Sequence, residues 1–136
     1  AGLVRSKNTT AILTKSIALY SVACIAFYLV GYNLMYGEGN TLIGSGFALS
    51  GTSSESHSLL SDFFFQVVFV ATAASIVSGT LAERIRFWPF LAFTLVLTAF
   101  IYPIQGHWSW GGTALGGLMD DFSDFAGSTI VHSVGG

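Results

Sequence analysis

Residues 63–81 read FFFQVVFVATAASIVSGTL, a run of 19 residues without a charged side chain. Asp62 stands directly before the run, and Glu83, Arg84 and Arg86 follow it. A helix needs about 20 consecutive apolar residues to cross the hydrocarbon core of a bilayer. The run therefore predicts a transmembrane helix with charged groups at both ends.

The second half of this run consists of small residues, which let helix backbones approach closely in lipid. They are Ala71, Ala73, Ala74, Ser75, Ser78 and Gly79. We expect this half to be buried against neighbouring helices.

Two further uncharged runs, residues 16–36 and residues 87–104, are long enough to cross a bilayer. Pro103 is expected to end the second of them. Between the first two runs in chain order, residues 37–61 are expected to form a polar connection. After the third run, residues 105–123 are expected to form a folded loop at the membrane surface. A fourth span is expected to open after that loop.

The composition supports this class of protein. Hydrophobic residues make up 52% of the chain and charged residues 9%, whereas a soluble domain carries roughly 25% charged residues. We therefore predict an all-α integral membrane protein, a multi-span helical bundle. A net charge of −2 gives no basic surface for nucleic acid. The single cysteine, Cys24, excludes an internal disulfide and a paired-cysteine metal motif.

The charges predict the orientation, because successive connections lie on alternate sides of the membrane. One side receives every basic residue, namely Arg5, Lys7, Lys15, Arg84 and Arg86. The other side receives the acids Glu38, Glu55, Asp62, Asp120, Asp121 and Asp124. Only Glu83 lies with the basic residues. Basic connections stay in the cytoplasm. We expect a multi-pass protein of the cell membrane with Trp110 and Asp124 outside.

Residues 123–136 read SDFAGSTIVHSVGG and place one histidine, His132, after the acid Asp124. If this segment is helical, the eight residues from Asp124 to His132 span about 12 Å, which brings the ring roughly halfway into the membrane. An ionisable group at that depth usually faces a pathway. A neutral imidazole both donates and accepts, so it can share a proton with a substrate. A hydrogen bond to a neighbouring helix and a haem ligand remain as alternatives.

Asp124 has two compatible roles at the start of this segment. It can stabilise a helix N-terminus, and it can attract cations to an outer vestibule. Trp108 and Trp110 lie on the same side and are also typical of an interfacial aromatic belt. Phe69 lies seven residues inside Asp62, about 10 Å below the outer boundary. A tryptophan, then Phe69, then His132 would form a permeation path, since aromatic faces attract cations.

Three segments together resemble the Amt/Mep/Rh ammonium transporter family, and most closely its Amt branch. They are DFAGSTIVHSVGG, FFFQVVFVATAASIVSGTLAERIRFWPF and YPIQGHWSWGG, and the opening AGLVRSKN resembles the inner end of that family's first helix. The resemblance covers nearly the whole chain apart from residues 37–61.

The resemblance implies a role for four residues. Trp110 matches the tryptophan of the family's outer recruitment site, and Asp124 matches the acid needed near that site. Phe69 matches one of two gating phenylalanines, and His132 matches the first of two pore histidines. A cation would then be drawn to Trp110 and Phe69, and His132 would contact the dehydrated substrate.

The resemblance also implies the context of the chain. Residues 1–136 would belong to a single membrane domain of eleven spans, as the end of helix 1, helices 2–4 and the outer half of helix 5. The chain would thus be a piece of a longer protein that forms homotrimers in the lipid bilayer. It would transport ammonium or ammonia without a cofactor or metal and would not be an enzyme. The alternative is an ammonium sensor that uses the same fold and is fused to a signalling domain.

Overall fold

A computed structural model describes residues 2–53, 56–111 and 122–136. Its regular elements are all helices, and η2 and η3 among them are π-helical turns. In chain order they are η1 (Ser6–Asn8), α1 (Thr9–Ala26), η2 (Phe27–Gly31), α2 (Tyr32–Tyr36), α3 (Leu59–Thr80), α4 (Phe87–Val96), η3 (Leu97–Ile101), α5 (Tyr102–Trp110) and α7 (Ile130–Gly135).

Three continuous helices are long and apolar enough to cross a membrane: Ser6–Tyr36, Leu59–Thr80 and Phe87–Trp110. The predicted all-helical class with three spans is therefore confirmed. The first two helices begin earlier than the uncharged runs. Lys15 lies within α1, and α3 includes Asp62 after an N-cap at Ser58, whose side chain accepts the backbone N–H of Ser61.

The prediction that Pro103 ends the third helix was wrong. The helix continues through Pro103 to Trp110, and the π-helical turn η3 directly precedes α5. Proline cannot donate a backbone hydrogen bond and its ring clashes with the carbonyl four residues earlier. The wider π-turn and the place of Pro103 in the first turn of α5 remove this conflict. Trp108 and Trp110 therefore stand on a rigid helix, whereas residues 112–121 of the expected loop lie outside the described residues.

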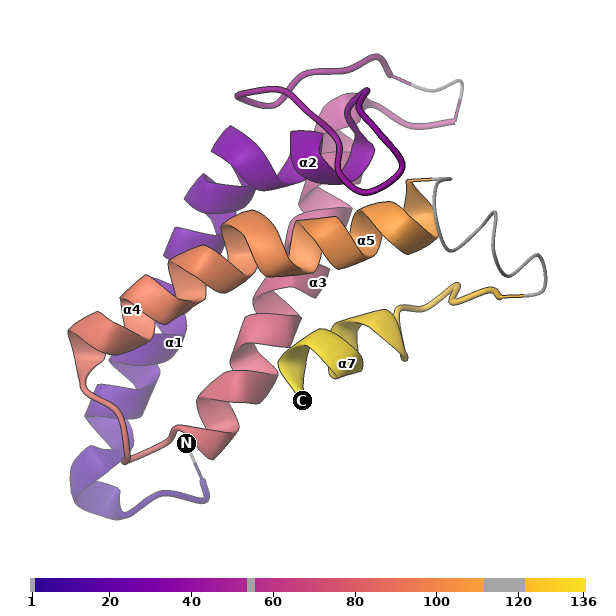
Figure 1. Ribbon diagram of the computed structural model, residues 1–136. Coiled ribbons are helices and arrows are strands. Elements are labelled where there is room, and N and C mark those ends of the chain that lie inside the picture. Colours follow the sequence, from indigo (N-terminus) through magenta and orange to yellow (C-terminus); the bar gives the residue numbers. More distant parts are fainter. Residues whose placement is uncertain (1, 54–55, 112–121) are drawn as a thin grey trace.

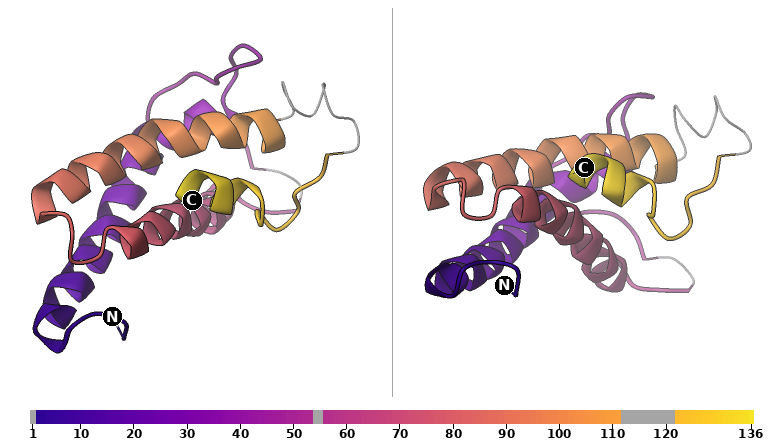
Figure 2. Two further views of the ribbon diagram at one scale, coloured as in Figure 1. Left: turned by 60° about the horizontal axis from the view of Figure 1, so that its bottom comes forward. Right: turned by 90° about the horizontal axis from the view of Figure 1, so that it is seen from below.

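The helices form a layered bundle around α3 (Figure 1). One side of α3 packs against α1, and the long helix of α4, η3 and α5 crosses α1 and α2. Both views in Figure 2 place α7 between α3 and α5, and α7 contacts both of these helices. The short helix that carries His132 is thus held by two spanning helices.

The small half of α3 is buried only in part. Ala71, Ala73 and Ala74 are buried, but Ser75 and Gly79 are exposed. A Cβ added at Gly79 would meet no atom within 4 Å. The expectation that the whole half is buried was therefore wrong for this structure, because only one face of the helix meets its neighbours α1 and α7.

A polar cluster joins the start of the chain to the turn between α3 and α4. The Glu83 carboxylate accepts the backbone N–H of Arg5 at 3.0 Å and the Asn8 amide at 2.7 Å. Arg5 Nε lies 3.2 Å from the second carboxylate oxygen. Nearby, Lys15 Nζ donates to the carbonyl of Ile85 at 2.6 Å. The start of α1 and the turn between α3 and α4 therefore lie together, as alternating connections require.

The hydrogen bonds from Asn8 and Arg5 lower the pKa of Glu83 below its ordinary value of 4.5. A lowered pKa means that the contribution to stability is full above that value and is lost as the pH falls through the folded-state pKa. We expect Glu83→Gln to lower the thermal midpoint slightly at neutral pH. The difference from the parent should be smaller at a pH below the folded-state pKa of Glu83, where the carboxyl is protonated. An equal difference at both pH values would show that the charge is irrelevant.

Candidate functional site

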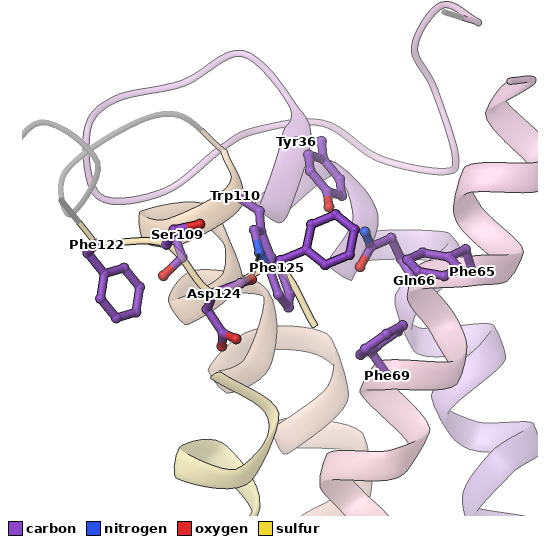
Figure 3. Close-up of a pocket in the computed structure, with 10 residues that line it drawn as sticks. Tyr36, Phe65, Gln66, Phe69, Ser109, Trp110, Phe122, Asp124 and Phe125 are labelled. Atoms are coloured by element: carbon purple, nitrogen blue, oxygen red, sulfur yellow. Dashed lines mark hydrogen bonds between the residues drawn. The ribbon is translucent and has the colours of Figure 1, made fainter. Parts of the chain in front are cut away.

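A cavity of about 330 Å³ opens at the end of the bundle opposite Glu83, between α2, α3, α5 and the segment before α7 (Figure 3). Six aromatic residues line it: Tyr36, Phe65, Phe69, Trp110, Phe122 and Phe125. Its polar lining comes from Gln66, Ser109, Ser123 and Asp124. An aromatic cavity with few polar groups is typical of a small-ligand site.

Trp110 and Phe69 meet in this cavity from different helices. Their ring centroids lie 6.4 Å apart with an interplanar angle of 76°, an edge-to-face pair. The indole N–H of Trp110 donates to the backbone carbonyl of Asp124 at 2.8 Å. This hydrogen bond fixes the indole at the end of α5, so that the ring lines the cavity rather than lying free at an interface.

The carboxylate of Asp124 is buried, with 8% of the residue exposed. One of its oxygens accepts the backbone N–H groups of Thr129 at 3.0 Å and Ile130 at 2.7 Å. The other accepts the hydroxyl of Ser128 at 3.3 Å. The carboxylate therefore satisfies the first free N–H groups of α7, as an N-cap does.

The prediction that Asp124 opens a helix was wrong, because α7 begins at Ile130. The chain first makes a turn in which Gly127 has a φ of 70°, a conformation that glycine adopts readily. Asp124 thus caps α7 from six residues before its first helical residue. The estimate of about 12 Å between Asp124 and His132 consequently does not apply, since it assumed a continuous helix.

His132 is exposed on the first turn of α7. It lines a second cavity of about 180 Å³ with Val68, Phe69, Thr72 and two residues of its own segment, Ala126 and Val131. Neither ring nitrogen of His132 has a hydrogen-bond partner among the described residues. Phe69 lines both cavities, the one that Trp110 lines and the one that His132 lines.

Sequence reasoning missed several residues of this site. Gln66 is the one polar residue of the run FFFQVVFVA, which could have marked it, and its Oε1 is buried without a partner in the described part of the chain. Tyr36 and Ser109 also line the cavity. His107 lies buried nearby, where its ring contacts the carbonyls of Met35 at 2.7 Å and Asn40 at 3.1 Å.

A model of the Ammonium Transporter Family matches residues 1–136. The chain belongs to this family. Ammonium transporter Amt2 of Archaeoglobus fulgidus is 42% identical over 147 residues, which cover 100% of this chain and 31% of that protein. Ammonium transporter 1 member 3 of Solanum lycopersicum is 37% identical, again over 100% of this chain and 31% of the relative.

A solved structure titled "Sensor Amt Protein" superposes on this chain with a TM-score of 0.88. The two are 37% identical, and the match covers 98% of this chain and 35% of the other. The chain thus spans about a third of the length of these relatives. As a member of the Ammonium Transporter Family with three apolar helices of spanning length, it is a membrane protein.

Gly127 offers a test of how tightly the chain packs beside Phe69 and Val131. A Cβ at this position would lie 2.9 Å from Val131 Cγ2 and 3.1 Å from Phe69 Cδ1. Because the backbone is also left-handed there, we expect Gly127→Ala to cost more than about 1 kcal/mol of unfolding free energy. Gly79→Ala is the matched control, since no described atom lies within 4 Å of the added methyl group. Denaturant unfolding of the full-length protein in detergent measures both, and equal stability of the two variants would contradict the contact.

Proposed function

We propose that the protein containing this chain transports ammonium or ammonia across the cell membrane through an apolar pore. The observation that carries the proposal is the order of the two cavities. Trp110 and Phe69 line the outer one, and Phe69 and His132 line the next. Family membership supplies the substrate class, because the relatives are named as ammonium transporters.

In this proposal the outer cavity recruits the cation. The faces of Trp110 and Phe69 attract a positive charge, by about 0.5 kcal/mol at an exposed site and about 2 kcal/mol where water is excluded. The Asp124 carboxylate adds a negative charge at the cavity and holds α7 in place. Both of its roles, recruitment and capping, therefore belong to the same hypothesis.

Phe69 acts as the gate and His132 as an ionisable contact behind it. The Phe69 ring must move for a substrate to pass from one cavity to the other, because it lines both. Beyond the ring, the second cavity is lined by Val68, Thr72, Ala126, Val131 and His132, and the Thr72 hydroxyl donates to the Val68 carbonyl of its own helix. A neutral imidazole can donate to or accept from a substrate that loses its water there, and it can share the substrate's proton.

The chain supplies part of the working transporter in this proposal. It corresponds to the end of helix 1, helices 2–4 and the outer half of helix 5 of a single membrane domain. The basic end, with Arg5, Lys15 and Arg86, faces the cytoplasm. Trp110 and Asp124 face outside. The full-length protein assembles as a homotrimer, and each subunit carries its own pore.

Flux through the full-length protein in liposomes tests this function. We expect ammonium or methylammonium uptake that His132→Ala reduces or makes unselective, because the substrate loses its polar contact in the apolar part of the path. Cys24→Ala is a suitable control, since Cys24 lies on α1 away from both cavities. Unchanged flux and selectivity in His132→Ala would remove this residue from the mechanism.

A sensor is the second candidate function, and one observation bears on it. The structure titled "Sensor Amt Protein" shares this fold at a TM-score of 0.88. A sensor would bind ammonium in the Trp110 cavity without conducting it. Ammonium binding to the purified full-length protein together with an absence of liposome flux would favour this role over transport.

Two substitutions separate the roles of Asp124. Asp124→Asn keeps an oxygen that can accept the N–H groups of Thr129 and Ile130 but removes the charge. We expect weaker transport with little loss of stability. Asp124→Ala removes the cap as well, which costs about 1 kcal/mol more of unfolding free energy. Flux and thermal unfolding measured on both variants check this, and equal instability of both would assign Asp124 a mainly structural role.

A further inference from the structure

The rotation of α7 about its axis decides where His132 points. Successive residues of a helix are rotated by about 100°, so a rotation by one position would swing the imidazole away from Phe69. The hydrogen bonds within a helix do not fix how the helix is rotated relative to its neighbours. Contacts with other elements must therefore determine the direction of the His132 ring.

One of these contacts was described above, and a second is steric. The Asp124 carboxylate holds the first N–H groups of α7. At the other end, Gly135 lies against α3, where an added Cβ would come within 2.9 Å of the Ala73 carbonyl oxygen and 2.8 Å of Ile76 Cβ. These contacts hold α7 at Ile130 and at Gly135, on either side of His132.

The third contact is a hydrogen bond from α5. Gln105 Nε2 donates to the hydroxyl of Ser133 at 2.5 Å. That hydroxyl in turn donates to the carbonyl of Ile130 in its own helix at 3.1 Å. Ser133 is the neighbour of His132 in the sequence, so this bond acts on the turn that carries the imidazole. Among the described residues, it is the hydrogen bond that links a side chain of α5 to a side chain of α7.

We propose that Gln105 is a positioning residue for His132. Its amide holds Ser133 and thereby sets the rotation of α7, which turns the imidazole toward the cavity below Phe69. A hydrogen bond between side chains is suited to this task, because an amide and a hydroxyl stay uncharged at every working pH and can persist between helices in lipid. The inference rests on the proposed role of His132 in the pore.

The experiment uses four single variants of the full-length protein and the double variant of Gln105→Met with Ser133→Ala. Gln105→Met keeps the length of the side chain but has no donor, Ser133→Ala removes the acceptor, and Ser133→Thr keeps a hydroxyl. Ser21→Ala is the matched control, because the Ser21 hydroxyl bonds only within its own helix, to the Ile17 carbonyl at 3.0 Å. The NMR signal of the His132 ring in histidine-labelled protein reports its surroundings directly, whatever the transport rate.

We expect Gln105→Met and Ser133→Ala to shift the His132 signal alike and to lower flux several-fold. The double variant should add no further change, because both substitutions break one bond. Ser133→Thr and Ser21→Ala should retain the parent signal and flux. An unchanged His132 signal in Gln105→Met would overturn the proposal, and so would fully additive effects of the two substitutions.

Failure of the pore hypothesis would look different. In that case His132→Ala would leave flux unchanged while Gln105→Met still moved the His132 signal. Positioning without a transport role would then stand as a structural fact about α7. A Gln105→Met substitution that lowered flux without moving the signal would instead assign the loss to general instability and would exclude a positioning role.

Discussion

Asp124 connects the two halves of the candidate site, because its carboxylate and its backbone carbonyl bind different helices. Its carboxylate holds the N–H groups at the start of α7, and its backbone carbonyl holds the indole of Trp110. A buried carboxylate is costly unless donors surround it, and here three donors do so. The relative placement of α5 and α7, and hence of Trp110 and His132, depends on this residue.

This arrangement leaves the carboxylate little freedom to coordinate a cation directly. In the proposed mechanism, attraction at close range falls to the ring faces of Trp110 and Phe69, whereas the charge of Asp124 acts over a longer distance. Ring faces alone separate ammonium poorly from an alkali cation of the same charge and similar size. A hydrogen-bonding group beyond the rings can make that distinction, because only ammonium carries N–H donors and a removable proton. The order of aromatic and polar groups therefore matters more than either group alone.

The three spanning helices could be predicted from the sequence, because an uncharged run of about 20 residues is typical of a helix that crosses a membrane. The family could also be identified from motifs around His132 and Trp110. Three features could not be predicted. The path of the helix through Pro103 depends on the π-turn before it, and the start of α7 depends on a turn at Gly127 that local hydropathy does not reveal. The bond of Gln105 to Ser133 joins residues 28 positions apart, so only the packing of α5 against α7 brings them together.

The packing of α7 on α3 bears on how the Phe69 ring can move. Gly135 allows α7 to lie within contact of the Ala73 carbonyl, and Gly127 lies against the Phe69 ring itself. Both contacts lack room for even one methyl group, so sliding of α7 along α3 would create clashes at two points. Rotation of the Phe69 side chain disturbs neither helix and needs only the space of the two cavities beside it. In the proposed transporter, the gate would therefore open by movement of the Phe69 ring between fixed helices, with His132 behind it.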